Sequence, residues 1–267
     1  MFNKHILAAV AGTALTLGTL ATASAAPVVY NLALSNISTF DNVITGTGAS
    51  VTTAQVIGGQ SVYNYTDING NPATVTVTRP NDTTINPSGG YTSNGVSLSG
   101  AVWNINPQSN TADPIPGFNS GLKFSFSSPV NAFGFEIGDW ATCCTTRVRP
   151  AAIQTTYGVP ATGSGLWIAF DGGAATLPAN ALSANDNPGF AAVRSYTNFI
   201  GAIDSSGFFS NVTFFGDGFG EFLVAGGTLR FASVPRGSVG GVPEPASLAL
   251  LGVGLAGLAA ARRRKTA

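Results

Sequence analysis

Residues 122–138 read LKFSFSSPVNAFGFEIG, and this stretch decides the fold class. Apolar residues alternate with small or polar ones on both sides of a break at Ser128-Pro129. The apolar set is Leu122, Phe124 and Phe126 before the break and Phe133, Phe135 and Ile137 after it. Side chains alternate between the two faces of a β-strand, so this spacing predicts two adjacent strands, each burying one aromatic face. At about 1.5–3 kcal/mol per fully buried large apolar side chain, these residues would supply a substantial share of one core.

Shorter runs of the same kind recur along the chain, separated by Gly, Pro, Asn and Asp. Further strands are expected at 28–34, 49–57, 73–78, 95–105, 165–171, 196–204, 208–215, 220–225 and 228–234. Gly207 and Gly226-Gly227 stand where hairpin turns are expected, and residues 81–90 and 104–117 are rich in turn residues and are expected to be loops. About ten or eleven short strands, with no helix between the two chain ends, predict an all-β two-sheet sandwich or jelly roll.

The N-terminal segment, residues 1–25, has the pattern of a signal peptide. Lys4 precedes an apolar run at 6–20, and Ala23 and Ala25 form a small-x-small cleavage site. After export through the Sec translocon, signal peptidase is expected to cut there, so that the mature chain begins at Ala26. The alternative is an uncleaved N-terminal helix.

The C-terminal segment, residues 242–267, has three consecutive parts. They are Pro243, Glu244 and Pro245, then residues 246–261 without a charge, then Arg262, Arg263, Arg264 and Lys265. Proline fixes φ and has no N–H group, so the segment around Glu244 is expected to be extended and accessible to another protein. As a single transmembrane helix, residues 246–261 would span about 24 Å, slightly less than a hydrocarbon core of about 30 Å. The basic cluster is expected to stop transfer and to hold the C-terminus in the cytoplasm.

The three parts in this order resemble the PEP-CTERM sorting signal of bacterial surface proteins, and the match extends over residues 242–265. The resemblance implies an exported protein that is anchored transiently in the membrane. It implies recognition at Pro243-Glu244-Pro245 by an exosortase, a membrane-embedded cysteine protease that cleaves near the motif. It also implies a Gram-negative envelope and its exopolysaccharide, or biofilm matrix, as the setting. The alternative is an ordinary C-terminal membrane anchor behind a proline-containing linker.

Two central stretches resemble the sandwich domains that are common in PEP-CTERM proteins. They are residues 124–140, with Phe133-Gly134-Phe135, and residues 198–220. In many of those domains an Asp-rich strand stands just before the tail, whereas this chain has Gly220-Glu221-Phe222-Leu223-Val224 there. A calcium or sugar role linked to that acidic pair is therefore not carried over.

Removal of both ends leaves an expected β-sandwich ectodomain at 26–234 and a flexible spacer at 235–241. The chain has 12 Lys and Arg and 12 Asp and Glu. Five of the basic residues and one of the acidic residues lie outside residues 26–241, so this part has seven basic and eleven acidic residues and a net charge of −4. This mildly acidic domain does not favour nucleic-acid binding, which needs a basic face.

The only histidine, His5, is expected to leave with the signal peptide. A mature domain without histidine lacks Ser-His-Asp and Cys-His catalysis and histidine-based zinc sites. We therefore expect a protein that is not an enzyme and needs no cofactor, with a structural or adhesive role at the cell surface. The alternatives are a carbohydrate-binding module, with or without calcium, and a hydrolase that uses carboxylates.

Several carboxylates and aromatics are candidates for these alternatives. For a hydrolase the pair is Glu136 and Asp139, with Trp140 as a sugar-stacking platform, although three positions apart on a strand they would face opposite sides. Calcium ligands could come from Asp217 and Glu221. The other oxygen-rich run is Asp67-Ile68-Asn69-Gly70-Asn71, which reads first as a turn. The three tryptophans, Trp103, Trp140 and Trp167, read first as core residues.

The two cysteines, Cys143 and Cys144, are adjacent. An oxidising compartment favours a disulfide, but consecutive Cα atoms are only about 3.8 Å apart, below the usual range of about 4.4–6.8 Å. Three interpretations stay open: a vicinal disulfide in a strained eight-membered ring, two free or intermolecular thiols, and a redox or metal function.

Overall fold

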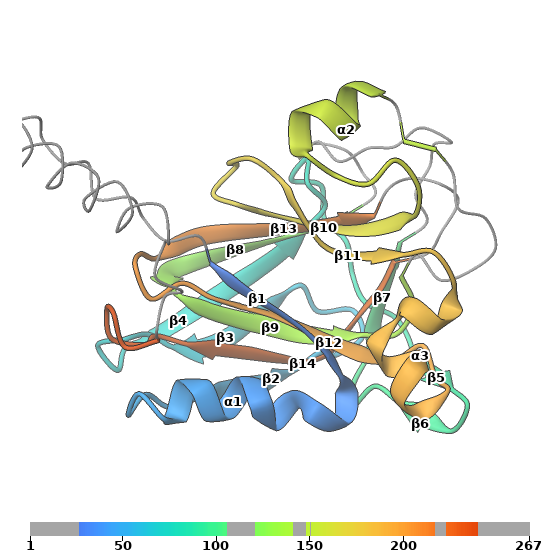
Figure 1. Ribbon diagram of the computed structural model, residues 1–267. Coiled ribbons are helices and arrows are strands. Elements are labelled where there is room, and N and C mark those ends of the chain that lie inside the picture. Colours follow the sequence, from blue (N-terminus) through green and yellow to red (C-terminus); the bar gives the residue numbers. More distant parts are fainter. Residues whose placement is uncertain (1–26, 106–120, 141–147, 150, 217–222, 240–267) are drawn as a thin grey trace, which may run out of the picture.

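The structure is a computed structural model, and it describes residues 27–105, 121–140, 148–149, 151–216 and 223–239. Two antiparallel sheets lie face to face and bury the core between them (Figure 1). This arrangement confirms the expected all-β sandwich.

The first sheet has the order β1 (Val28–Ala33), β12 (Asn198–Ile203), β9 (Ala132–Ile137), β14 (Leu223–Ala232) and β2 (Thr52–Gln55), and β7 (Val102–Ile105) also pairs with β14. The second has the order β11 (Thr176–Ala181), β10 (Ser164–Phe170), β13 (Phe209–Gly216), β8 (Gly121–Val130), β4 (Pro72–Thr78) and β3 (Val62–Thr66). A separate hairpin joins β5 (Thr92–Ser93) to β6 (Val96–Ser97).

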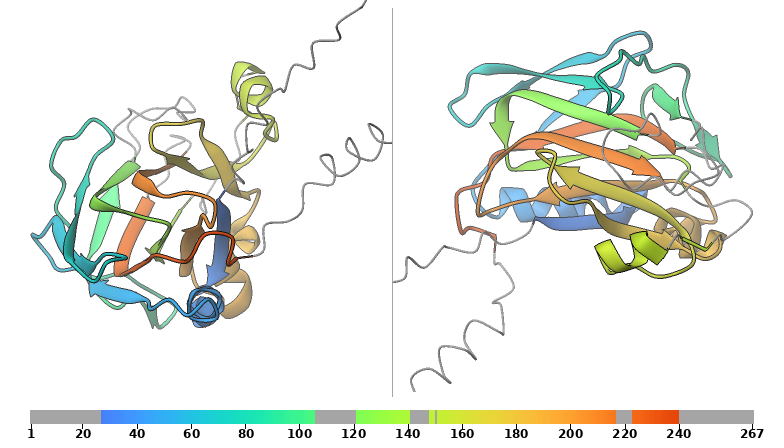
Figure 2. Two further views of the ribbon diagram at one scale, coloured as in Figure 1. Left: turned by 90° about the vertical axis from the view of Figure 1, so that its left-hand side faces the viewer. Right: turned by 90° about the horizontal axis from the view of Figure 1, so that it is seen from above.

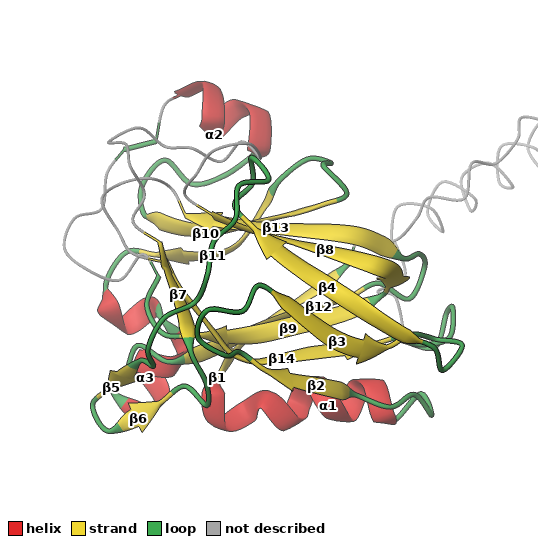
Figure 3. Ribbon diagram, turned by 180° about the vertical axis from the view of Figure 1, so that it is seen from behind, coloured by secondary structure: helices red, strands yellow, loops and turns green. Residues whose placement is uncertain are grey.

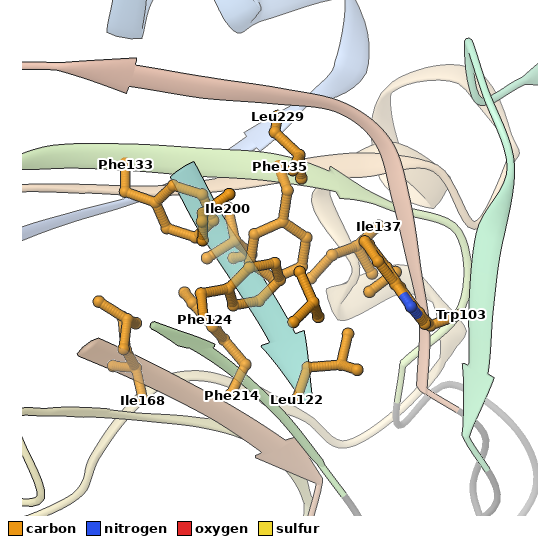
Figure 4. Packing of buried hydrophobic residues seen from close by; sticks show 14 of the residues in the cluster. Trp103, Leu122, Phe124, Phe133, Phe135, Ile137, Ile168, Ile200, Phe214 and Leu229 are labelled. Atoms are coloured by element: carbon orange, nitrogen blue, oxygen red, sulfur yellow. The ribbon is translucent and has the colours of Figure 1, made fainter. Parts of the chain in front are cut away.

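The central stretch forms two consecutive strands that belong to different sheets. Phe124 of β8 faces Phe133 and Phe135 of β9 across the core, with ring centroids 4.7 and 5.1 Å apart (Figure 4). The two buried aromatic faces are as predicted. The strands do not pair with each other, however, because the chain crosses from one sheet to the other between Val130 and Ala132.

The crossing is fixed by Asn131, which is fully buried. Its Nδ2 donates a hydrogen bond of 2.8 Å to the Val234 carbonyl, and its Oδ1 accepts one of 2.7 Å from the Val234 N–H. Its own carbonyl accepts a hydrogen bond from the Asp204 N–H at 2.7 Å. The side chain of Asn131 thus ties the crossing to the end of β14 and its backbone carbonyl ties it to the end of β12, so none of these backbone groups is left without a partner.

The expected hairpin at Gly226-Gly227 is wrong. The two glycines lie inside the continuous strand β14, with φ of 154° and 65°, and the register against β9 shifts between Gly226 and Arg230. They form a bulge, for which glycine supplies the positive φ. Before the bulge β14 pairs with β7, and beyond it with β2. The expected hairpin at Gly207 is also wrong, because β12 and β13 lie in different sheets.

The expectation of no internal helix is wrong as well. Three short α-helices are present, α1 (Ile37–Thr45), α2 (Ala151–Tyr157) and α3 (Pro188–Val193), together with 3-10 turns η1 (Leu34–Asn36) and η2 (Ala184–Asp186). Figure 2 shows α1 and α2 on opposite sides of the two layers. Beneath the first sheet, α1 runs along the outer face (Figure 3) and buries Phe40 and Ile44 there.

Most other expected strands are present, with some differences. The structure has strands within or overlapping 28–34, 49–57, 73–78, 165–171, 196–204 and 208–215. Three strands, β3, β5 and β11, were not expected. The expected strand 95–105 is divided into β6 and β7 by the irregular residues 98–101. Asn94 and Gly95, with φ of 48° and 79°, form the turn that pairs β6 with β5.

Candidate functional site

Glu136, one of the two candidate hydrolase carboxylates, is held on the outer face of β9. Its side chain is 4% exposed and accepts hydrogen bonds from the Ser99 N–H at 3.0 Å and the Ser99 Oγ at 2.8 Å. The bulge glycine Gly227 lies beside it, where a methyl group would come within 2.3 Å of the carboxylate. The carboxylate therefore fastens the segment before β7 to the first sheet.

The other members of that group do not complete a catalytic cleft. Asp139 follows the end of β9 and is partly exposed. Trp140 is 2% exposed, and its Nε1 donates to the Asn198 Oδ1 at 3.2 Å, so its ring offers no stacking platform. A glycosidase needs two carboxylates across a cleft, and Glu136 is enclosed by protein.

All three tryptophans belong to the interior, as the sequence indicated. Trp103 and Trp167 are fully buried, like Trp140. The Trp103 ring meets Phe124 edge-on at 6.1 Å, and its Nε1 donates to the Ile85 carbonyl at 3.3 Å. The expectation that these residues serve the core is confirmed.

The oxygen-rich run after β3 is a turn, also as expected. Asp67 Oδ1 accepts hydrogen bonds from the N–H groups of Asn69 and Asn71 at 2.9 and 2.8 Å. The backbone hydrogen bond from Asn71 is the main cause that lowers the pKa of Asp67, and the Asn69 backbone N–H and the Ser128 hydroxyl also lower it. Both oxygens thus serve the β3–β4 hairpin and its contact with β8. A hollow of about 260 Å³ borders the turn.

Cation sites were sought among the described residues, where no group of three or more His, Cys, Asp or Glu side chains is placed to hold a metal ion. Asp217 and Glu221 lie outside the described residues. Within the described part of the chain, no helix is long and apolar enough to cross a membrane. The expected span at 246–261 also lies outside that part.

Other predicted site residues lie outside the described residues too. They are Ala23, Ala25 and Ala26 at the signal cleavage site, Cys143 and Cys144, the motif Pro243, Glu244 and Pro245, and the basic cluster Arg262, Arg263, Arg264 and Lys265. The cysteines fall between two buried residues, Trp140 and Arg149. Arg149 is held by hydrogen bonds to the carbonyls of Pro160 and Thr162 at 2.9 and 3.2 Å.

The two ends of the described chain lie at the same end of the sandwich. At the N-terminal end, Val28 pairs with Ile203 of β12. At the other, Ser205 accepts a hydrogen bond from the Gly237 N–H at 2.9 Å, and its Oγ donates to the Val239 carbonyl at 3.0 Å. The described part of the expected spacer is therefore bonded to the domain, at the end of the sandwich where β1 begins.

An aromatic cluster that sequence reasoning missed lies at the other end of β12. Phe190 stacks on Tyr196 with ring centroids 4.9 Å apart, and the Arg194 guanidinium lies 5.9 Å from the Phe190 ring centre. Tyr91, which directly precedes the β5–β6 hairpin, packs its ring on Gly138, and the hairpin is bonded to Ser195 next to Tyr196. The Asn94-Gly95 dipeptide is the sequence signal that could have revealed this hairpin.

Comparison with known proteins assigns the C-terminal segment alone. No curated protein and no solved structure matches the chain. Residues 241–265 match the model of the PEP-CTERM protein-sorting motif, and this match contains the Pro-Glu-Pro sequence, the uncharged run and the basic cluster. The chain is therefore identified as a protein that carries a PEP-CTERM sorting motif.

Proposed function

We propose that this protein is a non-enzymatic structural or adhesive component of the cell surface, associated with exopolysaccharide. The sorting motif at residues 241–265 implies export, cell-surface targeting and processing by an exosortase. Within that frame, signal peptidase removes residues 1–25, the C-terminal segment holds the chain in the membrane, and exosortase cuts near Pro243-Glu244-Pro245. The sorting motif is the observation that carries the proposal.

The position of the chain ends supports this route. The Val28–Ile203 pair and the Ser205–Val239 hydrogen bond place both ends of the domain on one side. A domain held by its C-terminal segment therefore turns this end toward the membrane. The opposite end, with α3 and the β5–β6 hairpin, faces outward (Figure 1).

The interior supports a structural role over a hydrolytic one. Glu136 is bonded to Ser99 and enclosed, and Trp140 is buried. A hydrolase would have to use other carboxylates. A hydrolase built on Glu136 and Asp139 would release reducing sugar from a polysaccharide and would lose this activity with Glu136→Gln or Asp139→Asn, whereas we expect no release from the purified protein.

The sorting step is tested by Glu244→Ala and by deletion of residues 246–267, with Ser247→Ala as the matched control within the same segment. Intact-mass measurement and surface yield in the native host are the readouts. We expect both test variants to change the mature mass and lower the surface yield, whereas Ser247→Ala is processed like wild type. Unchanged processing of Glu244→Ala would contradict recognition at the motif.

A further inference from the structure

We propose that Tyr91, Phe190 and Tyr196, flanked by Arg194 and Asp139, form a surface that binds a neutral pyranose polysaccharide. This inference rests on the proposed function and adds to it a site and a ligand class. The five residues, called here the aromatic surface, come from the β5–β6 hairpin, the end of β9 and the α3–β12 segment.

The rings of the aromatic surface are partly exposed, whereas most aromatic rings of the described chain are buried. Tyr91, Phe190 and Tyr196 are all half-buried, whereas the rings around Phe124 are closed off in the core. A half-buried tyrosine offers an apolar ring face together with a wet hydroxyl. The C–H face of a pyranose stacks on such a ring while its hydroxyl groups stay in water. Two exposed apolar residues of the same segment, Leu182 and Val193, extend the apolar character of this end.

The backbone beneath the aromatic surface is held in place before any ligand arrives. Ser195 Oγ donates to the Ser93 carbonyl at 2.7 Å, and Asn94 Nδ2 donates to the Arg194 carbonyl. These contacts join two segments about one hundred residues apart in sequence. Binding to a prearranged surface avoids the entropy cost of ordering it.

The packing of Tyr91 further fixes its orientation. Its ring lies on Gly138, where a methyl group would come within 2.5 Å of a ring carbon. Burial raises the pKa of Tyr91 to about 12, with Asp139 adding to the effect. Like any tyrosine with a pKa of about 10 or above, the phenol is protonated at neutral pH, so its O–H group can act as a donor to a sugar hydroxyl.

The charges at the rim favour a neutral ligand. Arg194 is exposed and donates to Asn185 Oδ1 at 3.3 Å. Asp139 is partly exposed and follows Gly138, on which the Tyr91 ring lies. A guanidinium has several donors and a carboxylate has several acceptor positions, so together they can bond sugar hydroxyl groups as acceptors and as donors. The exposed Asp186 next to Asn185 adds a second carboxylate, so the surface has no excess positive charge to attract a polyanion.

The position in the fold fits a long extracellular polymer. Tyr196 lies just before β12, whose other end is near Ser205 and the C-terminal segment. At about 3.3 Å per residue, the six residues of this strand separate the aromatic surface from the membrane-facing end by about 20 Å. Figure 1 shows α3 and the β5–β6 hairpin at the end of the sandwich away from the start of β1, so a chain held at the membrane would present this end to the cell exterior.

The test is affinity electrophoresis of the full chain in detergent, in gels containing dextran, hydroxyethylcellulose or alginate. We expect at least one neutral polymer to retard the wild type. Phe190→Ala and Tyr196→Ala should weaken this retardation at least tenfold, and Tyr196→Phe should retain it because the ring remains. The matched control is Phe208→Ala, which removes an exposed ring from the other end of β12 and should have no effect.

Each outcome decides the proposal. Absence of retardation by both neutral polymers, binding of alginate alone, or an equal loss in the Phe208→Ala protein would overturn it. The alanine variants should have the circular dichroism spectrum and the thermal unfolding temperature of the wild type, which shows that they fold. Retained binding by Tyr196→Phe then attributes the loss in Tyr196→Ala to the missing ring. Mature mass and surface yield are measured for the same variants. A variant that is processed normally but no longer binds shows that the aromatic surface acts in binding and not in sorting. A wild-type protein that is not processed as expected would count against the sorting route and not against the aromatic surface.

Discussion

Gly134 of β9 lies directly opposite Gly201 of β12, and the two glycines make room for the ring of Phe199 on the outer face of the first sheet. A methyl group on Gly134 would come within 2.3 Å of Phe199, and one on Gly201 within 2.7 Å of both Phe199 and Phe40. The phenylalanines beside Gly134 point into the core. In the Phe-Gly-Phe sequence the phenylalanines therefore fill the core face of β9, and the glycine leaves room on the outer face for Phe199, against which Phe40 of α1 packs.

Gly134→Ala should lower the free energy of unfolding by about 1–3 kcal/mol, because overpacking forces neighbouring groups to shift. The Ile200 carbonyl, 2.9 Å from the new methyl group, cannot move freely within a paired strand. Gly216→Ala is the matched control, since no heavy atom lies within 4 Å of the added group there. Denaturant unfolding measures both. Equal stability of the two variants would contradict the role given to the glycine pair.

Glu136→Ala should also lower the free energy of unfolding by about 1–3 kcal/mol, because the Ser99 N–H loses its acceptor in a largely enclosed site. Glu136→Gln retains an acceptor oxygen and should be less damaging. Asp82→Ala is the control: it removes a surface ion pair with Lys123, for which about 0–1 kcal/mol is typical. If Glu136→Ala lowered the free energy of unfolding no more than Asp82→Ala does, the hydrogen bonds of the Glu136 carboxylate would not stabilise the fold as proposed.

The alternation in the sequence predicted the sandwich because it reports directly on which side chains are buried. Phe124, Phe133 and Phe135 lie where period two places them, and all three are in the core. Alternation carries no information on which strand pairs with which. The crossing at Asn131 depends on hydrogen bonds to Val234, more than one hundred residues away, and no local pattern encodes these bonds.

Local signals failed where one residue type serves two geometries. Gly226-Gly227 fits a hairpin turn and a bulge equally well, and only the pairing of β14 with both β7 and β2 distinguishes them. For α1, the buried pair Phe40 and Ile44 follows helical spacing. Its β-branched neighbours favour a strand, and packing on the sheet overrides that preference.

The candidate sites likewise differ in whether local sequence predicts them. Sequence reasoning correctly predicted the turn role of Asp67 and the burial of the tryptophans, since both follow from local chemistry. It did not find the aromatic surface, because Tyr91 and Tyr196 are distant in sequence and are joined through Ser93 and Ser195.

The raised pKa values of one buried and one half-buried tyrosine predict a loss of stability at alkaline pH. Burial raises the pKa of Tyr63 and of Tyr91 from 10.0 to about 12. The folded state therefore binds these protons more tightly than the unfolded state, so the stabilisation is complete below pH 10 and declines as the pH rises from 10 to about 12.

The Tyr63→Phe/Tyr91→Phe protein should show a shallower decline of stability over that interval. Denaturant unfolding at successive pH values and phenolate absorbance of the folded protein are the measurements. Phenolate absorbance rising fully near pH 10 in the wild type, before any unfolding, would contradict the raised pKa values.

Release of the docked spacer should accelerate cleavage at the sorting motif. Only residues 240–242 separate Val239 from Pro243. Four fully extended residue steps cover about 14 Å, which limits how far the motif can reach from the domain while Val239 stays bonded to Ser205. A protease embedded in the membrane must therefore work next to the folded domain, or the spacer must first detach.

Ser205→Ala combined with Gly237→Ala removes the Oγ hydrogen bond and places a side chain at a φ of 71°, where only glycine is unstrained. Detachment adds residues 235–239 to the reach of the motif, so the half-time from precursor to mature protein in a pulse–chase experiment should shorten. The control is Ser210→Ala, an exposed serine outside the spacer contact. A half-time equal to that of the control would show that spacer docking does not limit access. A longer half-time would instead indicate that the docked spacer presents the motif to the protease, because the bonded Val239 would then hold Pro243 at a favourable distance from the membrane.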